Sequence, residues 1–203
     1  MTPWYHLACW QLMSRRADAP PGRVRIVAGT LRGSRLDVPD APGLRPTSDR
    51  VRETLFNWLA PVIEGARCLD LFAGTGALGI EALSRGAASV DFVESDARLA
   101  ELLRANLVRL KQDARVSRDD AQRFVAAASA SYDVVFLDPP FDAGLWDSIA
   151  QALESSGVLD ARAWIYVESP SSIAPSLPAN WNLHREGHAG VVRYALYRRS
   201  AKL

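Results

Sequence analysis

The strongest chemical signal in the sequence is a glycine-rich segment at residues 70–79, which reads DLFAGTGALG. It lies where an apolar run of strand length ends and a helical pattern begins. Glycines in such a turn let a ligand approach the backbone closely. Glu94 lies eighteen residues after Gly76, at the end of the next predicted strand, where its carboxylate could bind ribose hydroxyls. The two features together predict a nucleoside-binding site.

The identity of that nucleoside is open from the glycine pattern alone. The pattern matches the dinucleotide fingerprint of NAD-dependent oxidoreductases, and a tight turn without any ligand is a further alternative. Asp70, however, places a carboxylate directly before the glycines. A carboxylate repels phosphate groups and attracts cations. The sequence therefore favours S-adenosylmethionine, which carries a sulfonium, an ammonium, a ribose and an adenine but no phosphate.

A second chemical signal is the segment DPPF at residues 138–141, directly after the apolar run of residues 132–137. The carboxyl end of a parallel strand beside a glycine loop is a place where ligands bind. The exocyclic amino group of a nucleobase is a poor nucleophile, because its lone pair is delocalised, so an enzyme must hold it with acceptors. The Asp138 carboxylate and the Pro139 carbonyl are such acceptors, and Phe141 offers a stacking face. The alternative is a plain strand-ending turn.

Strands and helices alternate in the part of the chain that must position these motifs. The predicted strands are residues 68–72, 90–93, 114–117, 132–137 and 163–167, and the predicted helices are residues 77–85 and 96–111. This alternation predicts an α/β fold with a parallel sheet covered on both faces. Residues 181–186 and 191–198, separated by a turn at 187–190, predict an antiparallel hairpin at the sheet edge, after a loop at 169–180.

The first sixty residues have a different texture and a positive charge. They carry nine arginines against five acids, residues 61–140 carry nine basic against twelve acidic residues, and the whole chain has a net charge of +1. Residues 23–28 and 34–38 predict a β-hairpin, and residues 49–60 predict a helix. We expect a flexible tail at residues 1–22, a basic appendage for nucleic-acid binding at 23–60 and a catalytic core at 61–203. The net charge alone would argue against a nucleic-acid partner, but the positive charge concentrated in the first sixty residues supports one.

Composition excludes several other classes of protein. No run approaches the ~20 apolar residues of a membrane helix, and 48% hydrophobic residues are too many for a disordered chain. Cys9 and Cys68 are too few for a disulfide framework. His6, His184 and His188 lack the spacing of metal ligands. We expect no signal peptide, no membrane segment and no metal, and a cytoplasmic location.

The motifs resemble those of class I S-adenosylmethionine-dependent methyltransferases that act on amino groups. More closely, the chain resembles the bacterial 16S ribosomal RNA guanine-N2 methyltransferase family, from about residue 23 to residue 199. The segments that carry this resemblance are RIVAG at 25–29, RG at 32–33, RPT at 45–47, RVRE at 50–53, the glycine segment, ESD at 94–96, DPPF at 138–141 and YVE at 166–168. The glycine segment and DPPF indicate the chemistry, whereas the RPT block and its helix indicate the family.

The resemblance implies a Rossmann-like class I methyltransferase fold. Its sheet would be mostly parallel and seven-stranded, with a C-terminal antiparallel hairpin and an N-terminal β-hairpin and helix. The implied reaction is methyl transfer from S-adenosylmethionine to the N2 amino group of a guanine in 16S ribosomal RNA. The implied partners are that RNA and the assembled or assembling small ribosomal subunit with its proteins, and we expect a monomer.

The resemblance also assigns roles to particular residues. The residues expected to bind the cofactor are Asp70, Phe72, Ala73, Gly74, Thr75, Gly76, Glu94, Ser95, Asp120 and Ala121. The residues expected at the target base are Asp138, Pro139, Pro140 and Phe141. The residues expected to contact RNA phosphates are Arg25, Arg32, Arg35, Arg45, Arg50 and Arg52. Asp120 could equally be a helix N-cap, and any single arginine could equally belong to a solvated surface.

Three alternatives to this function remain. A DNA methyltransferase acting on adenine N6 or cytosine N4 would share the DPPF segment. An NAD-dependent oxidoreductase would share the glycine loop and Glu94, but would leave Asp70 and the DPPF segment without a task. A non-catalytic RNA-binding module on the same fold would have a damaged cofactor loop, whereas this loop is intact.

Overall fold

The computed structural model describes residues 22–38 and 47–200. Most of the tail expected at residues 1–22 and the expected RNA contact Arg45 lie outside the described residues, while Gly22 begins the first strand. Within the described ranges, the helices are too short or too polar to cross a membrane.

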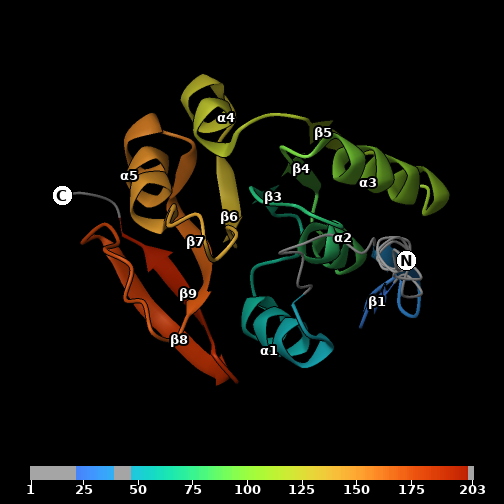
Figure 1. Cartoon of the computed structure of the whole chain (residues 1–203), viewed down its shortest axis with the longest axis horizontal. Helices are drawn as coiled ribbons and strands as arrows, with labels where there is room; N and C mark the ends of the chain where they lie inside the picture. The colour runs from blue at the N-terminus through green and yellow to red at the C-terminus, as the bar shows by residue number, and fades with distance from the viewer. Residues whose placement is uncertain (1–21, 39–46, 201–203) are drawn as a thin grey trace, which may run out of the picture.

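A seven-stranded sheet forms the centre of the molecule (Figure 1). Its strands, in spatial order, are β5 (Arg115–Ser117), β4 (Ser89–Val93), β3 (Arg67–Asp70), β6 (Tyr132–Leu137), β7 (Leu159–Pro170), β9 (Val192–Arg199) and β8 (Trp181–Ala189). The pairings from β5 to β7 are parallel, whereas β9 is antiparallel to both β7 and β8. Strand order reverses between β3 and β6, which is where open α/β sheets bind ligands. The predicted mostly parallel sheet with a C-terminal hairpin is confirmed.

Helices cover both faces of this sheet, because alternate residues of a strand point to opposite faces. The helices are α1 (Asp49–Leu59), α2 (Ala77–Ser84), α3 (Ala97–Arg109), α4 (Ala121–Ala127) and α5 (Trp146–Ser156). On one face, α1, α2 and α3 pack with Cys68 and Phe136, and on the other face, α4 and α5 pack with Leu69 and Val135 (Figure 1). The central strands are therefore apolar on both sides, as parallel strands are.

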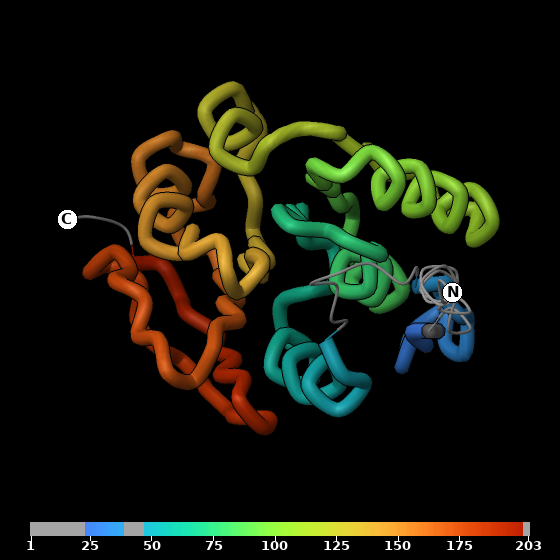
Figure 2. Tube along the Cα trace, viewed as in Figure 1, coloured from blue at the N-terminus to red at the C-terminus, as the bar shows by residue number. Residues whose placement is uncertain are grey.

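The N-terminal hairpin, made of β1 (Gly22–Arg25) and β2 (Arg35–Val38), packs beside α2 and α3 (Figure 2). The Glu81 carboxylate of α2 accepts hydrogen bonds from the Val27 and Ala28 amides at 2.8 and 3.0 Å. At Gly29, where φ is +79°, a Cβ would lie 1.8 Å from the Ser84 carbonyl oxygen. The apolar side chains of the hairpin share one cluster with α1, α2 and α3, so the basic segment is fixed to the core.

The C-terminal hairpin departs from its prediction. The sequence pattern predicts the turn at residues 187–190, but β8 continues to Ala189 and the chain reverses at Gly190, where φ is +60°. Gly187 lies inside the strand opposite Tyr194, and a Cβ on Gly187 would lie 2.4 Å from the Tyr194 ring. Gly187 thus makes room for an aromatic ring and does not form the turn.

The sequence prediction omits α5, gives no bounds for α4 and shortens β7. In α5, Trp146, Ile149, Ala150 and Leu153 are buried on one face, the spacing of an amphipathic helix, and Gly157 ends the helix with a φ of 80°. Strand β7 begins four residues before the predicted run and extends to Pro170, because β6 and β9 pair with it on either side. The predicted loop at 169–180 is therefore shorter than expected.

Candidate active site

The glycine loop connects the end of β3 to the start of α2. Gly76 caps the helix with a φ of +80°, and a Cβ there would lie 2.3 Å from Leu103 Cδ1. A side chain on Gly79 would meet the Phe92 ring at 2.2 Å. Only glycine fits the conformation of the first position and the space at the second. The loop is thus built so that α2 approaches the sheet closely, with its first amides near the loop.

Asp70, the last residue of β3, is buried beneath this loop and hydrogen-bonds to it. Its carboxylate is 2% exposed and accepts a hydrogen bond from the Gly79 amide at 2.9 Å. Burial raises the pKa of Asp70 to about 7, the Gly79 hydrogen bond opposes the rise, and the charge of Glu94 adds to it. Asp70 contributes negative charge beneath the loop as well as a structural contact.

Glu94, at the end of β4, closes the loop from the neighbouring strand. Its two carboxylate oxygens accept hydrogen bonds from the amides of Gly74 and Asp96, both at 2.8 Å. Ser95 follows it and is exposed. Each carboxylate oxygen has lone pairs beyond those used here, so Glu94 keeps acceptor capacity for a ribose. The structure brings Glu94 and the glycine loop together as the sequence predicts.

Other predicted cofactor residues line the same edge of the sheet. Phe72 is half-buried in the loop, while Ala73 and Thr75 are buried. Asp120 caps α4, since its carboxylate accepts from the Gln122 and Arg123 amides at 2.9 and 3.1 Å. Ala121 is the first residue of that helix and is buried. The N-cap interpretation of Asp120 is confirmed, and contact of Asp120 with a cofactor stays a prediction.

The DPPF segment follows β6 directly and lies beside the glycine loop. Asp70 pairs with Phe136 across β3 and β6, so Asp138 lies just beyond the end of β3. Asp138 and Phe141 are part-exposed, Pro139 is buried and Pro140 is exposed. The Phe141 ring lies 6.2 Å from the Trp146 ring of α5, in a tilted arrangement. The two motifs that are far apart in sequence therefore meet at the switch point of the sheet.

Sequence reasoning gave no role to three residues that surround Asp138. The Thr47 hydroxyl lies 3.5 Å from Asp138 Oδ2 and 3.1 Å from Glu168 Oε2. The Tyr166 hydroxyl donates to the same Glu168 oxygen at 2.7 Å. A signal was present, because Tyr166 and Glu168 are polar residues two apart near the carboxyl end of β7, alternating with the apolar residues Ile165 and Val167. The described residues contain no group of three or more His, Cys, Asp or Glu side chains that could hold a metal ion.

The prediction that Arg52 contacts RNA is wrong. Its side chain is fully buried, so it offers no surface to a phosphate. The guanidinium donates to the Thr47 carbonyl at 3.2 Å, the Arg25 carbonyl at 2.8 Å and the Asp49 carboxylate at 2.6 Å. It also lies 3.6 Å from the buried carboxylate of Glu81. Arg52 ties α1 to the hairpin, to α2 and to the segment that carries Thr47.

The other described arginines of the basic block are on the surface. Arg25, Arg32, Arg35 and Arg50 are exposed, and Arg25 forms an ion pair of 3.7 Å with Asp49. They come from the hairpin and from α1, which the core holds in fixed positions. Their contact with RNA phosphates stays a prediction.

Comparison with known proteins decides the family. A family model described as conserved hypothetical protein 95 matches residues 24–198. Ribosomal RNA small subunit methyltransferase D of Escherichia coli is 53% identical over 192 residues, which cover 94% of this chain and 97% of that protein. The protein of the same name from Haemophilus influenzae is 45% identical, over 87% of this chain and 94% of its own.

This chain belongs to the family of small subunit ribosomal RNA methyltransferases.

Solved structures agree with that assignment. The Escherichia coli methyltransferase yhhF has a TM-score of 0.83 and 50% identity, covering 89% of this chain and all of its own. A methyltransferase named SMU.776, complexed with S-adenosylhomocysteine, has a TM-score of 0.61 at 15% identity, covering 81% of this chain and 53% of its own, and shares the fold. The family and the α/β methyltransferase fold expected from the sequence are confirmed. Membership of this small subunit ribosomal RNA methyltransferase family excludes the alternative of an NAD-dependent oxidoreductase.

Proposed function

We propose that this protein transfers a methyl group from S-adenosylmethionine to the N2 amino group of a guanine in 16S ribosomal RNA. The observation that carries the proposal is the position of the Asp138 carboxylate, which lies beside the glycine loop where strand order reverses between β3 and β6. The relatives' names point to RNA of the small ribosomal subunit as the substrate. An acceptor for an amino group and a nucleoside site therefore lie side by side in a chain of that family.

The charges around the site fit S-adenosylmethionine. Asp70, Asp138 and Glu168 lie close enough that the charges of Asp70 and Glu168 raise the pKa of Asp138, in addition to the larger effect of burial. A cationic ligand relieves this repulsion, whereas the phosphates of a dinucleotide would increase it. The Gly76 turn and the free acceptor capacity of Glu94 supply a backbone cradle and a ribose contact. The residues present fit the cofactor.

The residues of the DPPF segment would hold the target base. The cofactor, when bound, supplies a methyl group activated by the positive sulfur. Asp138 and the Pro139 carbonyl accept hydrogen bonds from the guanine amino group and direct its lone pair, and Phe141 stacks on the base. Asp138 accepts the proton that the methylated amino group loses, so the reaction requires no histidine. Alignment and exclusion of water supply most of the rate.

The basic block would hold the RNA around the flipped base. Arg25 and Arg50 present cations near the sheet edge that carries Asp138, since Arg50 lies in the first turn of α1, Arg25 pairs with Asp49, and Thr47, two residues before α1, contacts Asp138. Arg32 and Arg35 would extend this surface along the hairpin. We assign residues 23–60 to RNA binding and residues 61–203 to the methyltransferase core. Arg45 belongs to the same proposal. We further propose a monomer that acts in the cytoplasm on the assembled or assembling small subunit and contacts its proteins.

The test of this function is methyl transfer in vitro with isotopically labelled S-adenosylmethionine. The substrates are small ribosomal subunits and free 16S RNA that lack the modification, with duplex DNA as a separate arm, and the products are digested to nucleosides for mass spectrometry. We expect labelled N2-methylguanosine in the RNA arm. The exposed Asp113→Asn variant, changed at the opposite edge of the sheet, is the matched control and should react like the wild type.

The DNA arm decides the main alternative. Labelled N6-methyladenine or N4-methylcytosine in DNA, with unlabelled RNA, would replace the proposed substrate by DNA. Label in a base of RNA other than guanine would keep the RNA substrate and overturn the guanine assignment. The comparison of subunits with free RNA shows which form of the substrate the basic block recognises.

A further inference from the structure

Two acidic side chains from neighbouring strands meet behind the target-base site. Leu137 of β6 pairs with Val167 of β7 in parallel register, so Asp138 and Glu168 come next along each strand at the same edge of the sheet. Asp138 is part-exposed, whereas Glu168 is 6% exposed. Glu168 therefore lies one layer deeper than Asp138 and can act on a substrate only through other residues.

Glu168 is held in one position by three contacts. Its backbone carbonyl accepts from the Trp146 indole at 2.7 Å. Its carboxylate accepts from the Tyr166 hydroxyl at 2.7 Å and from the Thr47 hydroxyl at 3.1 Å. Such contacts leave the carboxylate little freedom, and each hydroxyl favours its charged form.

The Thr47 hydroxyl connects Glu168 to Asp138 and has a single proton to give. Its distance to Glu168 is 3.1 Å and its distance to Asp138 is 3.5 Å, so the shorter contact directs the proton to Glu168. The Asp138 oxygens then keep their lone pairs for the amino group of the substrate. Without an acceptor at Glu168, the Thr47 proton would point to Asp138 and compete with that amino group.

The charged and titratable groups around Asp138 are mostly acidic. Glu168 from β7 and Asp70 from β3 raise the pKa of Asp138 after the larger effect of burial, and a hydrogen bond from Thr47 lowers it only when Thr47 donates to Asp138. Burial raises the pKa of Glu168 as well, against the hydrogen bonds of Tyr166 and Thr47. Tyr166 and Tyr194 are the neighbouring phenols, and burial keeps the pKa of Tyr166 above its usual value. The nearby guanidinium of Arg52 contacts the Thr47 carbonyl and is paired with Asp49 and Glu81.

We propose that Glu168 is a positioning residue for methyl transfer, which acts on Asp138 through the Thr47 hydroxyl and through its own negative charge. It takes the Thr47 proton, so that Asp138 faces the amino group as a free acceptor. Its charge makes Asp138 a stronger base, so that Asp138 accepts the proton released from N2 more readily. This inference rests on the proposed function, because it requires an amino group at Asp138.

The test is the pH dependence of single-turnover methyl transfer to 16S RNA in two isosteric variants. Glu168→Gln removes the neighbouring charge, so the acid limb of the rate profile should move to lower pH by about one unit, with a rate on the plateau reduced about tenfold. Thr47→Val removes the donor that favours the ionised form of Glu168, so the acid limb should move in the same direction, by on the order of half a unit. A move to higher pH would show that Thr47 donates to Asp138, and would overturn the route through Thr47. If Glu168 and Thr47 had a merely structural role, the substitutions would lower stability and leave the acid limb of both variants in place.

A second measurement reads Asp138 without any reaction. The carboxyl carbon of Asp138, labelled with carbon-13, is titrated by NMR in the wild type and in both variants. Its midpoint should fall in both variants, and further in Glu168→Gln. Glu154→Gln is the matched control, because Glu154 is a similarly enclosed glutamate that lies on α5 and hydrogen-bonds to the C-terminal hairpin. That variant should leave the acid limb and the Asp138 midpoint unchanged.

The outcomes separate this inference from the proposed function. If the wild type methylates 16S RNA but Glu168→Gln shifts neither the acid limb nor the midpoint, the role of Glu168 is overturned and the function stands. Equal shifts in Glu154→Gln would overturn it too, since any buried carboxylate would then act alike. If the wild type methylates no guanine, the proposed function fails and this role fails with it, whatever the NMR midpoints do.

Discussion

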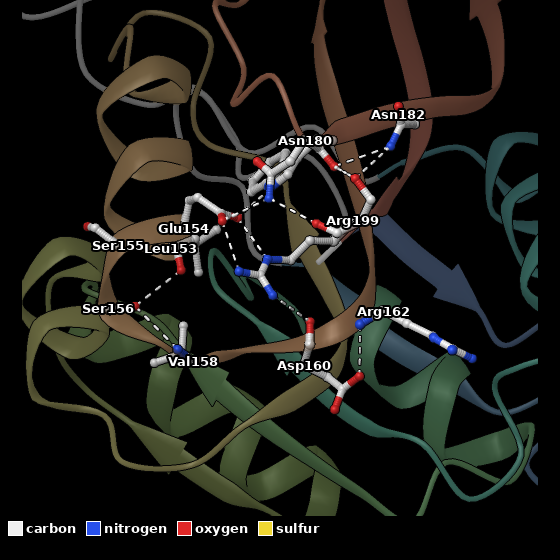
Figure 3. A network of polar contacts seen from close by, with 12 residues as sticks. Leu153, Glu154, Ser155, Ser156, Val158, Asp160, Arg162, Asn180, Asn182 and Arg199 are labelled. Atoms are coloured by element: carbon white, nitrogen blue, oxygen red, sulfur yellow. Dashed lines mark hydrogen bonds and ion pairs between the residues drawn. The ribbon is translucent and has the colours of Figure 1, made fainter. Parts of the chain in front are cut away.

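Two glutamates of this protein sit in similar networks of donors but have opposite electrostatics. Glu154 of α5 accepts from the Arg199 guanidinium at 2.8 Å and from the Asn180 amide at 2.9 Å (Figure 3). It also accepts from the Trp181 indole at 3.0 Å. Burial alone would raise the pKa of Glu154, but these three donors, with the charge of Arg199, lower it to about 2. The ion pair joins α5 to β9 and fixes the C-terminal hairpin.

Glu168 has two hydroxyl donors and an acidic neighbour in place of the guanidinium. Burial therefore raises the pKa of Glu168 and, together with the charges of Glu168 and Asp70, raises that of Asp138. The attraction between a buried carboxylate and a guanidinium offsets part of the desolvation cost of the carboxylate. Two carboxyl groups that share one hydroxyl, as Glu168 and Asp138 share Thr47, have no such compensation. Folding alone gives no reason to keep such a cluster, and perturbed pairs of this kind concentrate at sites of chemistry. The difference between the two networks separates a structural site from a functional one.

The largest effect on stability is expected at Arg52. It pairs with the buried Glu81, so this is a second place where a guanidinium compensates a buried glutamate. Arg52→Ala leaves the buried Glu81 carboxylate with less compensation and frees the Thr47 carbonyl, so the free energy of unfolding should fall by about 3 kcal/mol. Urea denaturation followed by circular dichroism measures this. The matched control is Arg50→Ala on the exposed side of α1, which should leave stability within about 0.5 kcal/mol of the wild type.

The same pair of arginines tests the RNA surface. Arg50→Ala should reduce the slope of RNA affinity against salt concentration by about one, as expected for the loss of one phosphate contact. In Arg52→Ala, the slope of RNA affinity against salt concentration, measured for the folded protein, should stay unchanged, because the Arg52 guanidinium is buried. A loss of slope in Arg52→Ala alone would show that Arg52, and not Arg50, contacts a phosphate.

A somewhat smaller effect is expected from Arg199→Ala. Removing the guanidinium leaves Glu154 with neutral donors, and the free energy of unfolding should fall by about 2 kcal/mol near neutral pH. The folded pKa of Glu154 lies below its unfolded value, so the stabilisation is present above the unfolded pKa and is lost as pH falls towards about 2. The stability difference between wild type and variant should shrink over that range. Methyl transfer per folded molecule should not change, and a matching loss of transfer would contradict the separation of the two networks.

Substitution of Asp138 should change the free energy of unfolding in the opposite direction, and by the smallest amount. Its folded pKa is raised, so the ionised carboxylate costs stability above that pKa, and the cost disappears as pH falls to the unfolded value. Asp138→Asn should therefore raise the free energy of unfolding by about 1 kcal/mol at about pH 8, and the gain should vanish in acid. Thermal unfolding at several pH values tests this. A variant that is less stable than the wild type at high pH would show that the cluster contributes to folding.

Local patterns predict this fold better than they predict contacts between distant segments. The strands that flank the glycine loop and DPPF are continuous apolar runs, so both motifs could be placed at the carboxyl edge before the structure was known. The helical spacing of α5 is visible in the sequence, although no helix is predicted there. Gly187 resembles a turn residue in sequence, and only the pairing with Tyr194 reveals that it makes room for a ring.

The same limit explains the residues that were misplaced or missed at the site. Arg50 and Arg52 look alike in sequence, and their burial depends on how α1 packs against Glu81, which lies 29 positions away from Arg52 in the chain. Glu168 and Thr47 are 121 positions apart and meet only because the segment before α1 crosses the ends of β6 and β7. Sequence motifs identify the reacting carboxylate, and tertiary packing determines the residues that act on it.

The most direct test of the account uses Asp138→Ala with two readouts on the same preparation. Calorimetry measures the binding of S-adenosylmethionine, and transfer of the labelled methyl group to 16S RNA measures the reaction. The account predicts that binding persists close to the wild-type affinity, while N2-methylguanosine formation falls by about a hundredfold or more. Undiminished transfer in this variant would contradict the assignment of Asp138 and with it the central claim.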